Sequence, residues 1–502
     1  MSTLSDLLPA GSGGKQVDFV ADGAINKGQT VALKTDGKVE PISSTSFNDE
    51  FQNEYYTSNL GTGYTNTRNI APVWDSSAGR LVAAALGGGN VVIWSATESG
   101  TIGSTYNLNQ STATTVNSGY TAGSLQGLAY HATDERVVIM VTDGSYQNLY
   151  AYPVEIASNG TITVGTAASV AFGSNLEDGK LIYDPVNNKL VAIYRNNGVA
   201  KYNIISVSGG SLSVVAASNI PTGTITDTDF KYLQQTGQVG LAYSDSSNSY
   251  YPMAIIGTVS GNNVSWGTAQ QVESSGENPR IAQDNNGKIG YVIAASGGVA
   301  KGYAGTLTGN NVSFGSSSTI YNPQGENRLA MYFDTNAKKF VVGADTNLAP
   351  YAYVWLGTVS GTTFSWVQNQ YTMRANSGDK QIRQTCGFFT PEAGFGTGLG
   401  YFFWFNDGSG TAWMGLSYAR PAYTINLNEN FIGIADSAIS NTATGSVTIK
   451  GGIATNTSLP TLTPNSVYYV QGDGTISTTS TSPAVRIGKA LSSTSINLEF
   501  NS

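Results

Sequence analysis

The sequence repeats a weak pattern about every fifty residues between Ile70 and Pro421. Each copy contains a short apolar strand, a tight polar turn and a longer apolar strand. The clearest copies occupy residues 70–82, 180–194, 280–291 and 329–342. A strand-based repeat of this length indicates a radial array of β-sheets, because one unit cannot bury its apolar faces without neighbours.

Seven copies can be marked by the first apolar residue of the second strand: Leu81, Val137, Leu190, Val239, Ile289, Phe340 and Leu399. A second pattern follows in the repeat as a hairpin, at residues 257–267, 305–315 and 357–367, with weaker versions at 156–164 and 205–214. Gly-Asn and Gly-Gly tolerate the positive φ of a two-residue β-turn. Two strands from each pattern would form a four-stranded antiparallel blade. We therefore expect an all-β chain with a seven-bladed β-propeller over residues 46–422, with a β-sandwich series and a parallel β-helix as alternatives.

The two flanks have short strands and turns but lack the repeat. A flank of this size at the N-terminus cannot bury enough apolar surface to fold alone. A closed propeller brings its own ends together, so it can be inserted into a loop of another domain. We predict that residues 1–45 and 423–502 form one split β-barrel or sandwich for attachment or oligomerisation, and that residues 51–60 close the ring against the last blade.

Charge and composition exclude several partners. The net charge is -8, the pI is about 4.8, and Lys and Arg are not clustered, which argues against a nucleic-acid partner. No apolar stretch is long enough to span a membrane, and the first ten residues lack the features of a signal peptide. We therefore predict synthesis in a cytoplasm and no membrane insertion.

Metal and cysteine chemistry have little support. The chain has one cysteine, Cys386, and one histidine, so neither an intrachain disulfide nor a cysteine-based metal cage is possible within it. An aspartate ends the first strand of four repeats, just before a tight turn: Asp75, Asp184, Asp284 and Asp334. An Asx-turn explains these aspartates without calcium. We expect no cofactor.

The motifs of common enzymes are also missing. A Ser-His-Asp or Cys-His site needs a histidine, and His131 lies in a turn. A glycosidase needs two carboxylates, but Glu54, Asp245 and Asp379 are interpreted as solvated loop charges. Sialidase-like propellers carry Ser-x-Asp-x-Gly-x-Thr-Trp turns and an arginine triad, whereas the nearest analogue here, residues 260–266, lacks the aspartate. The sequence therefore predicts a protein that is not an enzyme.

Aromatic residues favour a binding role. Aromatic faces stack on the apolar faces of sugars, while Asn, Asp and Ser side chains bind hydroxyl groups. The alternative for each aromatic residue is packing within a strand or a structural loop contact. The candidate binding residues, expected in loops, are Tyr55, Tyr56, Tyr250, Tyr251, Tyr351, Tyr353, Trp404 and Trp413.

Three phrases in the flanks, residues 21–33, 431–435 and 464–475, resemble a module common in virion proteins of tailed bacteriophages. Tail fibres and other appendages of marine and cyanobacterial phages carry this module. The hairpin phrase at 257–267 looks like tandem repeats in the same class of proteins.

The resemblance implies a location in the virion, on the tail, an appendage or the capsid surface, with other virion proteins as partners. It implies a tail-fibre or appendage-type adhesin that binds host surface glycans or proteins. The alternatives are a structural decoration or adaptor protein and a polysaccharide depolymerase. By analogy with fibres, a homo-oligomer is expected, with a trimer favoured.

Overall fold

The chain is all-β and divides into two compact units. The computed structural model describes residues 15–57, 70–87, 89–102, 104–117, 121–295, 299–321, 328–345, 351–375, 382–390, 398–406, 413–455, 459–480 and 483–499. One unit comprises Met1–Phe47 with Ala422–Ser502 (the flanking unit), and the other comprises Asn48–Pro421 (the ring unit). Over these described ranges, the only helical element is a 3-10 turn, η3 (Leu427–Asn430), in the flanking unit.

The described residues of the ring unit form seven antiparallel sheets, numbered here in chain order. In the first five, strands pair in chain order and two short outer strands both pair with the third strand. The first sheet contains β6 (Ile70–Asp75), β7 (Arg80–Gly87), β8 (Asn90–Ser99), β9 (Asn107–Gln110) and β10 (Thr114–Thr115). The second contains β11 (Ala122–His131), β12 (Arg136–Asp143), β13 (Asn148–Ile156), β14 (Ile162–Val164) and β15 (Ala168–Phe172).

The next sheets follow the same plan. The third contains β16 (Glu177–Asp184), β17 (Lys189–Asn196), β18 (Val199–Ser208), β19 (Ser211–Val214) and β20 (Ser218–Asn219). The fourth contains β21 (Ile225–Leu233), β22 (Gln238–Asp245), β23 (Tyr251–Ser260), β24 (Asn263–Trp266) and β25 (Gln270–Gln271). The fifth contains β26 (Glu277–Gln283), β27 (Ile289–Ala295), β28 (Val299–Thr308), β29 (Asn311–Phe314) and β30 (Ser318–Tyr321).

The last two sheets have four strands each. The sixth contains β31 (Arg328–Asp334), β32 (Lys339–Asp345), β33 (Tyr351–Ser360) and β34 (Thr363–Ala375). The seventh contains β35 (Ile382–Thr390), β36 (Leu399–Asn406), β37 (Trp413–Arg420) and β5 (Glu50–Thr57). Strand β5 comes from the start of the ring unit and pairs antiparallel with β37, which confirms the predicted closing role of this segment.

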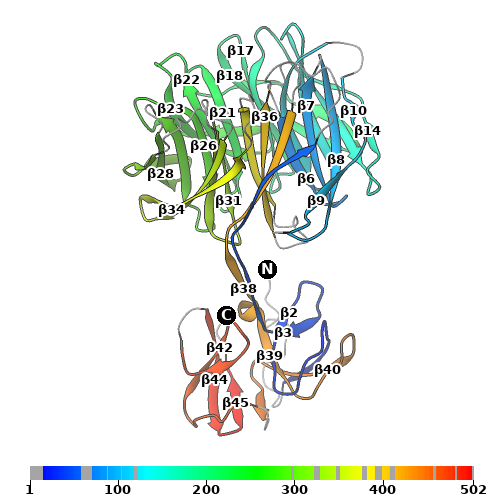
Figure 1. Ribbon diagram of the computed structural model, residues 1–502, viewed down its shortest axis with the longest axis vertical. Coiled ribbons are helices and arrows are strands. Elements are labelled where there is room, and N and C mark those ends of the chain that lie inside the picture. The colour runs from blue at the N-terminus through cyan, green and yellow to red at the C-terminus, as the bar shows by residue number, and fades with distance from the viewer. Residues whose placement is uncertain are drawn as a thin grey trace. The chain divides into compact units, whose positions relative to one another are not determined.

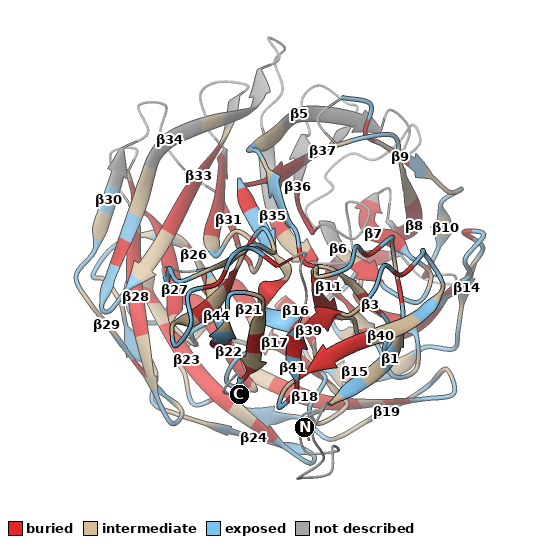
Figure 2. Ribbon diagram, turned by 90° about the horizontal axis from the view of Figure 1, so that it is seen from below, coloured by how far each residue is buried: buried red, intermediate tan, exposed pale blue. Residues whose placement is uncertain are grey.

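The sheets close into a circle. The first strand of each sheet contacts the first strand of the next, from β6 through β11, β16, β21, β26 and β31 to β35, and β35 contacts β6. Figure 2 shows the sheets placed around a common centre. This circular array of antiparallel sheets is the arrangement of a β-propeller.

Apolar side chains of the second strands pack between neighbouring sheets. The anchor residues marked in the sequence lie at the start of these strands and are buried. Glycines make room for large residues of the next sheet: a Cβ at Gly290 would lie 2.5 Å from Phe340, and one at Gly343 would lie 2.6 Å from Phe402. The sheets therefore approach closely because small and large residues face each other.

Aspartates fasten the turns after four first strands. One carboxylate oxygen of Asp184 accepts the backbone N–H groups of Val186 and Asn187 at 2.9 and 3.2 Å. Asp334 accepts those of Asn336 and Ala337 at 2.9 and 2.8 Å. Asp75 accepts those of Ser77 and Ala78, and Asp284 accepts those of Asn286 and Lys288. The predicted Asx-turns are confirmed.

His131 occupies the corresponding position in the second sheet. Its side chain is buried, its Nδ1 accepts the N–H of Asp134 at 3.3 Å, and its ring packs 4.7 Å from that of Tyr183. Burial lowers the pKa of His131, against the smaller opposite effect of the Asp134 charge. The histidine therefore acts as a neutral substitute for the turn aspartate.

This arrangement predicts a pH dependence. Because the folded pKa of His131 is below its unfolded value, its contribution to stability is present above about pH 6.5 and is lost as the pH falls. In His131→Asn the amide oxygen can still accept the Asp134 N–H, so the thermal midpoint should fall less between pH 7.5 and 5.5 than in the natural chain. Burial also raises the pKa of Asp334 to about 6, which favours the folded state at lower pH. Both chains contain Asp334, so this effect does not alter the comparison between them. Identical midpoint shifts in the two chains would contradict the assignment.

The flanking unit combines strands from both ends of the chain (Figure 1). Its first sheet has the order β1-β40-β39-β2-β3, so N-terminal strands border a C-terminal hairpin on both sides. Its second sheet has the order β41-β45-β44-β42-β43, and β4 pairs with β38. The strands are β1 (Gln16–Val20), β2 (Thr30–Leu33), β3 (Val39–Pro41), β4 (Ser44–Phe47), β38 (Tyr423–Asn426), β39 (Phe431–Ala435), β40 (Thr444–Ile449), β41 (Ile453–Thr455), β42 (Val467–Gln471), β43 (Ile476–Ser477), β44 (Ala484–Ser492) and β45 (Ser495–Leu498).

Candidate functional site

The two ends of the sheets in the ring unit differ. At one end, the first strands begin and the second strands connect to the third; we call this end the leading face. At the other end, the first strands turn into the second; we call it the turn face. In the seventh sheet, Arg420 pairs with Glu50 at the turn face, whereas Met414 pairs with Thr57 at the leading face. The chain therefore enters and leaves the ring unit at the turn face.

The structure places the eight predicted binding residues toward the leading face, but only Tyr250 lies in a connection, between β22 and β23. The prediction that these residues lie in loops is wrong for the other seven. Tyr55 and Tyr56 lie in β5, Tyr251 in β23, Tyr351 and Tyr353 in β33, Trp404 in β36 and Trp413 in β37. Aromatic residues favour strands, which explains why these seven lie within them. The structure does not describe the side chains of Tyr55, Tyr56, Tyr351, Trp404 and Trp413.

Exposed apolar side chains also gather at the leading face. Tyr250 is 58% exposed, with φ of 59°, and Tyr251 is half-buried. Phe172, at the end of β15, is 77% exposed, and Val199, at the start of β18, is 44% exposed. Sequence reasoning missed Phe172, although the polar Gly-Ser-Asn segment that follows it was an available signal. Val186 is exposed at the turn face.

The first strands of three consecutive sheets carry a bulge near the leading face. A residue with positive φ occupies each bulge: Asp178 at 53°, Asp227 at 47° and Asn278 at 50°. Bulges in barrels and at active sites redirect side chains, and a left-handed conformation in a residue other than glycine is a cost retained only by surrounding structure. The sequence signal for these bulges is the similarity of residues 177–180 (Glu-Asp-Gly-Lys) and 277–280 (Glu-Asn-Pro-Arg).

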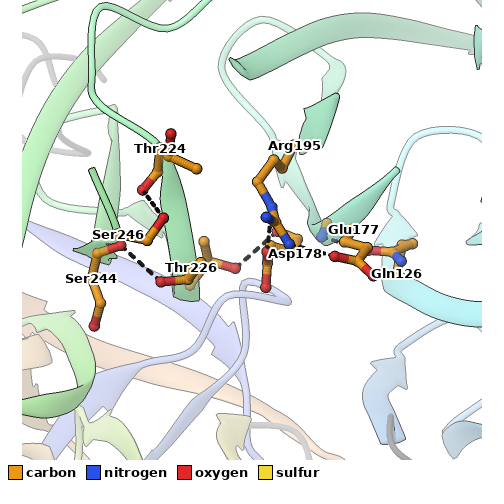
Figure 3. Close-up of polar contacts among 10 residues, drawn as sticks. Gln126, Glu177, Asp178, Arg195, Thr224, Thr226, Ser244 and Ser246 are labelled. Atoms are coloured by element: carbon orange, nitrogen blue, oxygen red, sulfur yellow. Dashed lines mark hydrogen bonds and ion pairs between the residues drawn. The ribbon is translucent and has the colours of Figure 1, made fainter. Parts of the chain in front are cut away.

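Arg195 joins the acidic residues at the first of these bulges (Figure 3). Its Nε donates to the carboxylate of Asp178 at 2.9 Å, and its Nη2 donates to Glu177. Burial raises the pKa of Asp178 despite the opposing charge of Arg195. Buried Gln126, from β11, accepts the N–H of Gly179, so this cluster also connects the second and third sheets.

Hydroxyl groups extend the polar surface into the fourth sheet (Figure 3). Thr226 donates to the carbonyl of Ser244 at 3.0 Å, and Ser246 donates to that of Thr224 at 3.4 Å. The hydroxyl of Ser244 is fully buried and has no hydrogen-bond partner among the described residues. Hydroxyls and carboxylates next to exposed aromatic residues are the groups that bind sugars.

A second acidic site lies on the connection into the fifth sheet. Glu273 accepts hydrogen bonds from Lys301 Nζ at 2.9 Å and from the Tyr303 hydroxyl at 2.8 Å. The hydrogen bond from Lys301, with that of the Ser274 N–H, lowers the pKa of Glu273 to about 2. This carboxylate is therefore ionised at any physiological pH.

A second candidate site is a hollow of about 270 Å³ at the turn face, between the fifth and sixth sheets. Its walls include Asp284, Asn285, Lys338 and Phe340. Asp284 is engaged in its own turn, and Asn285 donates to the carbonyl of Thr335 at 2.9 Å. These groups hold the turns together, so the leading face is the better candidate.

Of the three carboxylates considered for glycosidase chemistry, the structure describes only the side chain of Asp245. Asp245 ends β22 rather than lying in a loop, and its Oδ1 accepts the Ser247 N–H at 3.0 Å and hydroxyl at 2.6 Å. Glu54 lies in β5 and Cys386 in β35, with side chains outside the described set, and Asp379 lies outside the described residues. Within the described ranges, no group of three or more His, Cys, Asp or Glu residues is placed to hold a metal, and no helix has the length and apolarity to cross a membrane.

The sequence matches no family model and no curated protein. Solved structures that resemble the chain include the intramolecular trans-sialidase from Ruminococcus gnavus, at 13% identity and a TM-score of 0.41, covering 74% of this chain and 97% of that one. The leech intramolecular trans-sialidase has 11% identity and a TM-score of 0.42, with coverage of 74% and 70%. The β-propeller domain of Myceliophteria thermophila Cps50 (Swd1) has 9% identity and a TM-score of 0.42, with coverage of 72% and 99%. The likeness concerns the fold and assigns no reaction.

The prediction that the chain is not an enzyme is contradicted by the two trans-sialidases among these structures, because enzymes occur among propellers of this kind. The prediction relied on the scarcity of His and Cys and on absent motifs. Carboxylates and tyrosines also support glycoside chemistry, and the chain has both in quantity. We therefore withdraw that exclusion.

Proposed function

We propose that the seven sheets of the ring unit are the blades of a seven-bladed propeller inserted into a split β-barrel or sandwich, and that the protein is a phage adhesin. In this proposal the flanking unit joins the protein to the virion tail, an appendage or the capsid surface. The leading face of the ring unit binds a glycan or protein on the host surface. Support for the phage assignment comes from the resemblance of the flank and hairpin phrases.

One observation carries the binding role. The eight aromatic residues selected from the sequence and the two exposed apolar residues, Phe172 and Val199, lie toward the leading face, whereas the chain enters and leaves the ring unit at the turn face. A surface that binds host cells must be free of the connection to the virion. Aromatic rings beside hydroxyl and carboxylate groups fit a saccharide better than a wholly apolar partner.

The experiment that tests this function is binding of fluorescently labelled full-length protein to marine cyanobacterial cells and to a glycan array. Saturable binding to cells that the phage infects, and not to resistant cells, is expected. Antibody against the ring unit should label the tail or an appendage in electron micrographs of virions. Absence of cell and glycan binding, with antibody label spread over the capsid, would favour the decoration or adaptor role. Release of reducing sugar from host envelope would favour the depolymerase.

The flanking unit is also proposed to hold an oligomer, with a trimer favoured by analogy with fibres. Ile453 and Leu491 are exposed in its second sheet, at 53% and 52%, which leaves apolar surface for another chain. Several weak sites on one assembly increase avidity without new contacts. Light scattering of the full-length chain tests this proposal, and a monomer would contradict it.

A further inference from the structure

The first strands of the third, fourth and fifth sheets carry charged residues at matching positions. Lys180 of β16, Asp229 of β21 and Arg280 of β26 each follow the bulge of their own strand. Lys231 lies two residues beyond Asp229, on the same side of β21 because side chains alternate along a strand. Four charged side chains, three of them cationic, therefore stand on first strands next to one another in the circle.

These side chains are close enough to influence one another. The charges of Asp178, Arg280, Asp229 and Lys231 all act on the amine of Lys180, although β16 and β26 belong to sheets that are not neighbours. Strand β21 contacts both β16 and β26, so Lys180, Lys231 and Arg280 stand on three first strands that lie side by side in the circle. Lys180, Lys231 and Arg280 are partly exposed as whole residues, although the amine of Lys180 is itself buried.

Three of the four carboxylates near these cations are already engaged. Asp229 accepts the N–H of Ile281 at 3.0 Å and lies 3.5 Å from Lys231. Asp178 and Glu177 bind Arg195, whereas Asp227 is exposed. Arg280 directs Nε to the carbonyl of Leu329 at 2.6 Å and Nη1 to that of Pro279 at 2.8 Å.

The amine of Lys180 has no carboxylate partner within ion-pair distance among the described residues. Its hydrogen bond goes to the carbonyl of its neighbour Gly179 at 3.2 Å, which leaves donor capacity unused. Burial lowers the pKa of Lys180, against the smaller opposite effects of the Asp178 and Asp229 charges. An anion arriving between Lys180, Lys231 and Arg280 would add to these opposite effects.

We propose that Lys180, Lys231 and Arg280 form a site for the carboxylate of an acidic sugar. The proposal rests on the function given above, because it specifies the chemistry of the saccharide bound at the leading face. A carboxylate meets the three cations, while the sugar hydroxyls meet partly exposed polar groups such as Thr226. Charge-assisted hydrogen bonds of this kind contribute more to affinity than neutral ones.

The test measures binding of glucuronate and glucose to the full-length protein by isothermal titration calorimetry. Glucuronate should bind at least about tenfold more tightly than glucose, and Lys180→Met should weaken glucuronate binding by about tenfold or more. Lys189→Met is the matched control, because Lys189 lies in the same sheet at the turn face, where it donates to Ser206 at 2.7 Å. This control should bind as the natural chain does.

Equal affinity for glucuronate and glucose would overturn the proposal. The proposal would also be overturned if Lys180→Met bound glucuronate like the natural chain, or if Lys189→Met lost as much glucuronate affinity as Lys180→Met. Retained thermal stability of Lys180→Met separates lost binding from misfolding, and Lys231→Met provides a second variant. Cell binding that survives in Lys180→Met would overturn this site and leave the adhesin function standing. Glucuronate binding that depends on Lys180, without cell binding, would support the site and contradict the adhesin.

Discussion

Deleting residues 1–45 should unfold the C-terminal part of the flanking unit while leaving the ring unit folded. The deletion removes β1, β2 and β3, which border the β39–β40 hairpin on both sides. One apolar cluster would lose Ala21, Ile25, Val31 and Val39, so its C-terminal members Ala435, Ile439, Val447 and Ile449 would face water. A two-stranded hairpin is marginal in water without such packing.

Hydrogen exchange measured by mass spectrometry gives the readout separately for each unit. Amides of β39 and β40 should exchange rapidly in the deleted chain, whereas those of β17 and β22 should stay protected as in the natural chain. A permuted chain with residues 1–45 joined after residue 502 by a flexible linker is the control and should recover protection. If a 423–502 fragment is protected as strongly as in the full chain, the shared domain is wrong.

Replacing Gly267 by alanine should destabilise the ring unit by about 3 kcal/mol or more. Gly267 follows β24 of the fourth sheet, and a Cβ there would lie 1.8 Å from the backbone oxygen of Asn310 in the fifth. Asn310 is held in place, since its amide donates to Ser265 at 2.6 Å and its Oδ1 accepts from Thr258 at 2.6 Å. A backbone oxygen fixed in this way cannot move aside, so the two sheets must separate.

Denaturant unfolding followed by tyrosine and tryptophan fluorescence measures the effect. Gly261→Ala is the control, because a Cβ at Gly261 meets no atom within 4 Å and its φ of 58° costs alanine only about 1 kcal/mol. Gly315 faces the oxygen of Thr362 at 1.9 Å, so Gly315→Ala should repeat the larger loss one sheet further on. Equal midpoints for Gly267→Ala and Gly261→Ala would show that the hairpin contact between sheets is unimportant.

Features encoded within a repeat could be predicted from the sequence. The turn aspartates and the hairpins at 257–267, 305–315 and 357–367 depend on residues a few positions apart, and strands pair there as expected. The closing strand could also be predicted, because a ring with an incomplete last sheet needs a strand from its other end. The extra short strands β15, β20, β25 and β30 were missed, since each is a brief continuation of the outer edge.

The candidate site could be predicted only in part. The candidate aromatic residues were assigned to loops, but seven of the eight lie in strands, because residue type alone does not show where a strand ends. The grouping of Lys180, Asp229 and Arg280 depends on the closing of the circle, which brings residues about fifty positions apart into one space. Likewise, the bulges at Asp178, Asp227 and Asn278 arise from pairing with the second strands, and their sequence signal is limited to the similarity of residues 177–180 and 277–280.

The most direct test of the adhesin proposal is host-cell binding by a leading-face variant. Phe172→Ala with Tyr250→Ala removes two exposed rings, at 77% and 58% exposure, whose loss should leave the fold intact. Val186→Ala is the control, because Val186 is 74% exposed at the turn face. The account predicts that the double variant binds host cells at least about tenfold more weakly than the natural chain while Val186→Ala binds normally. Unchanged binding by the double variant, or equal loss in Val186→Ala, would contradict it.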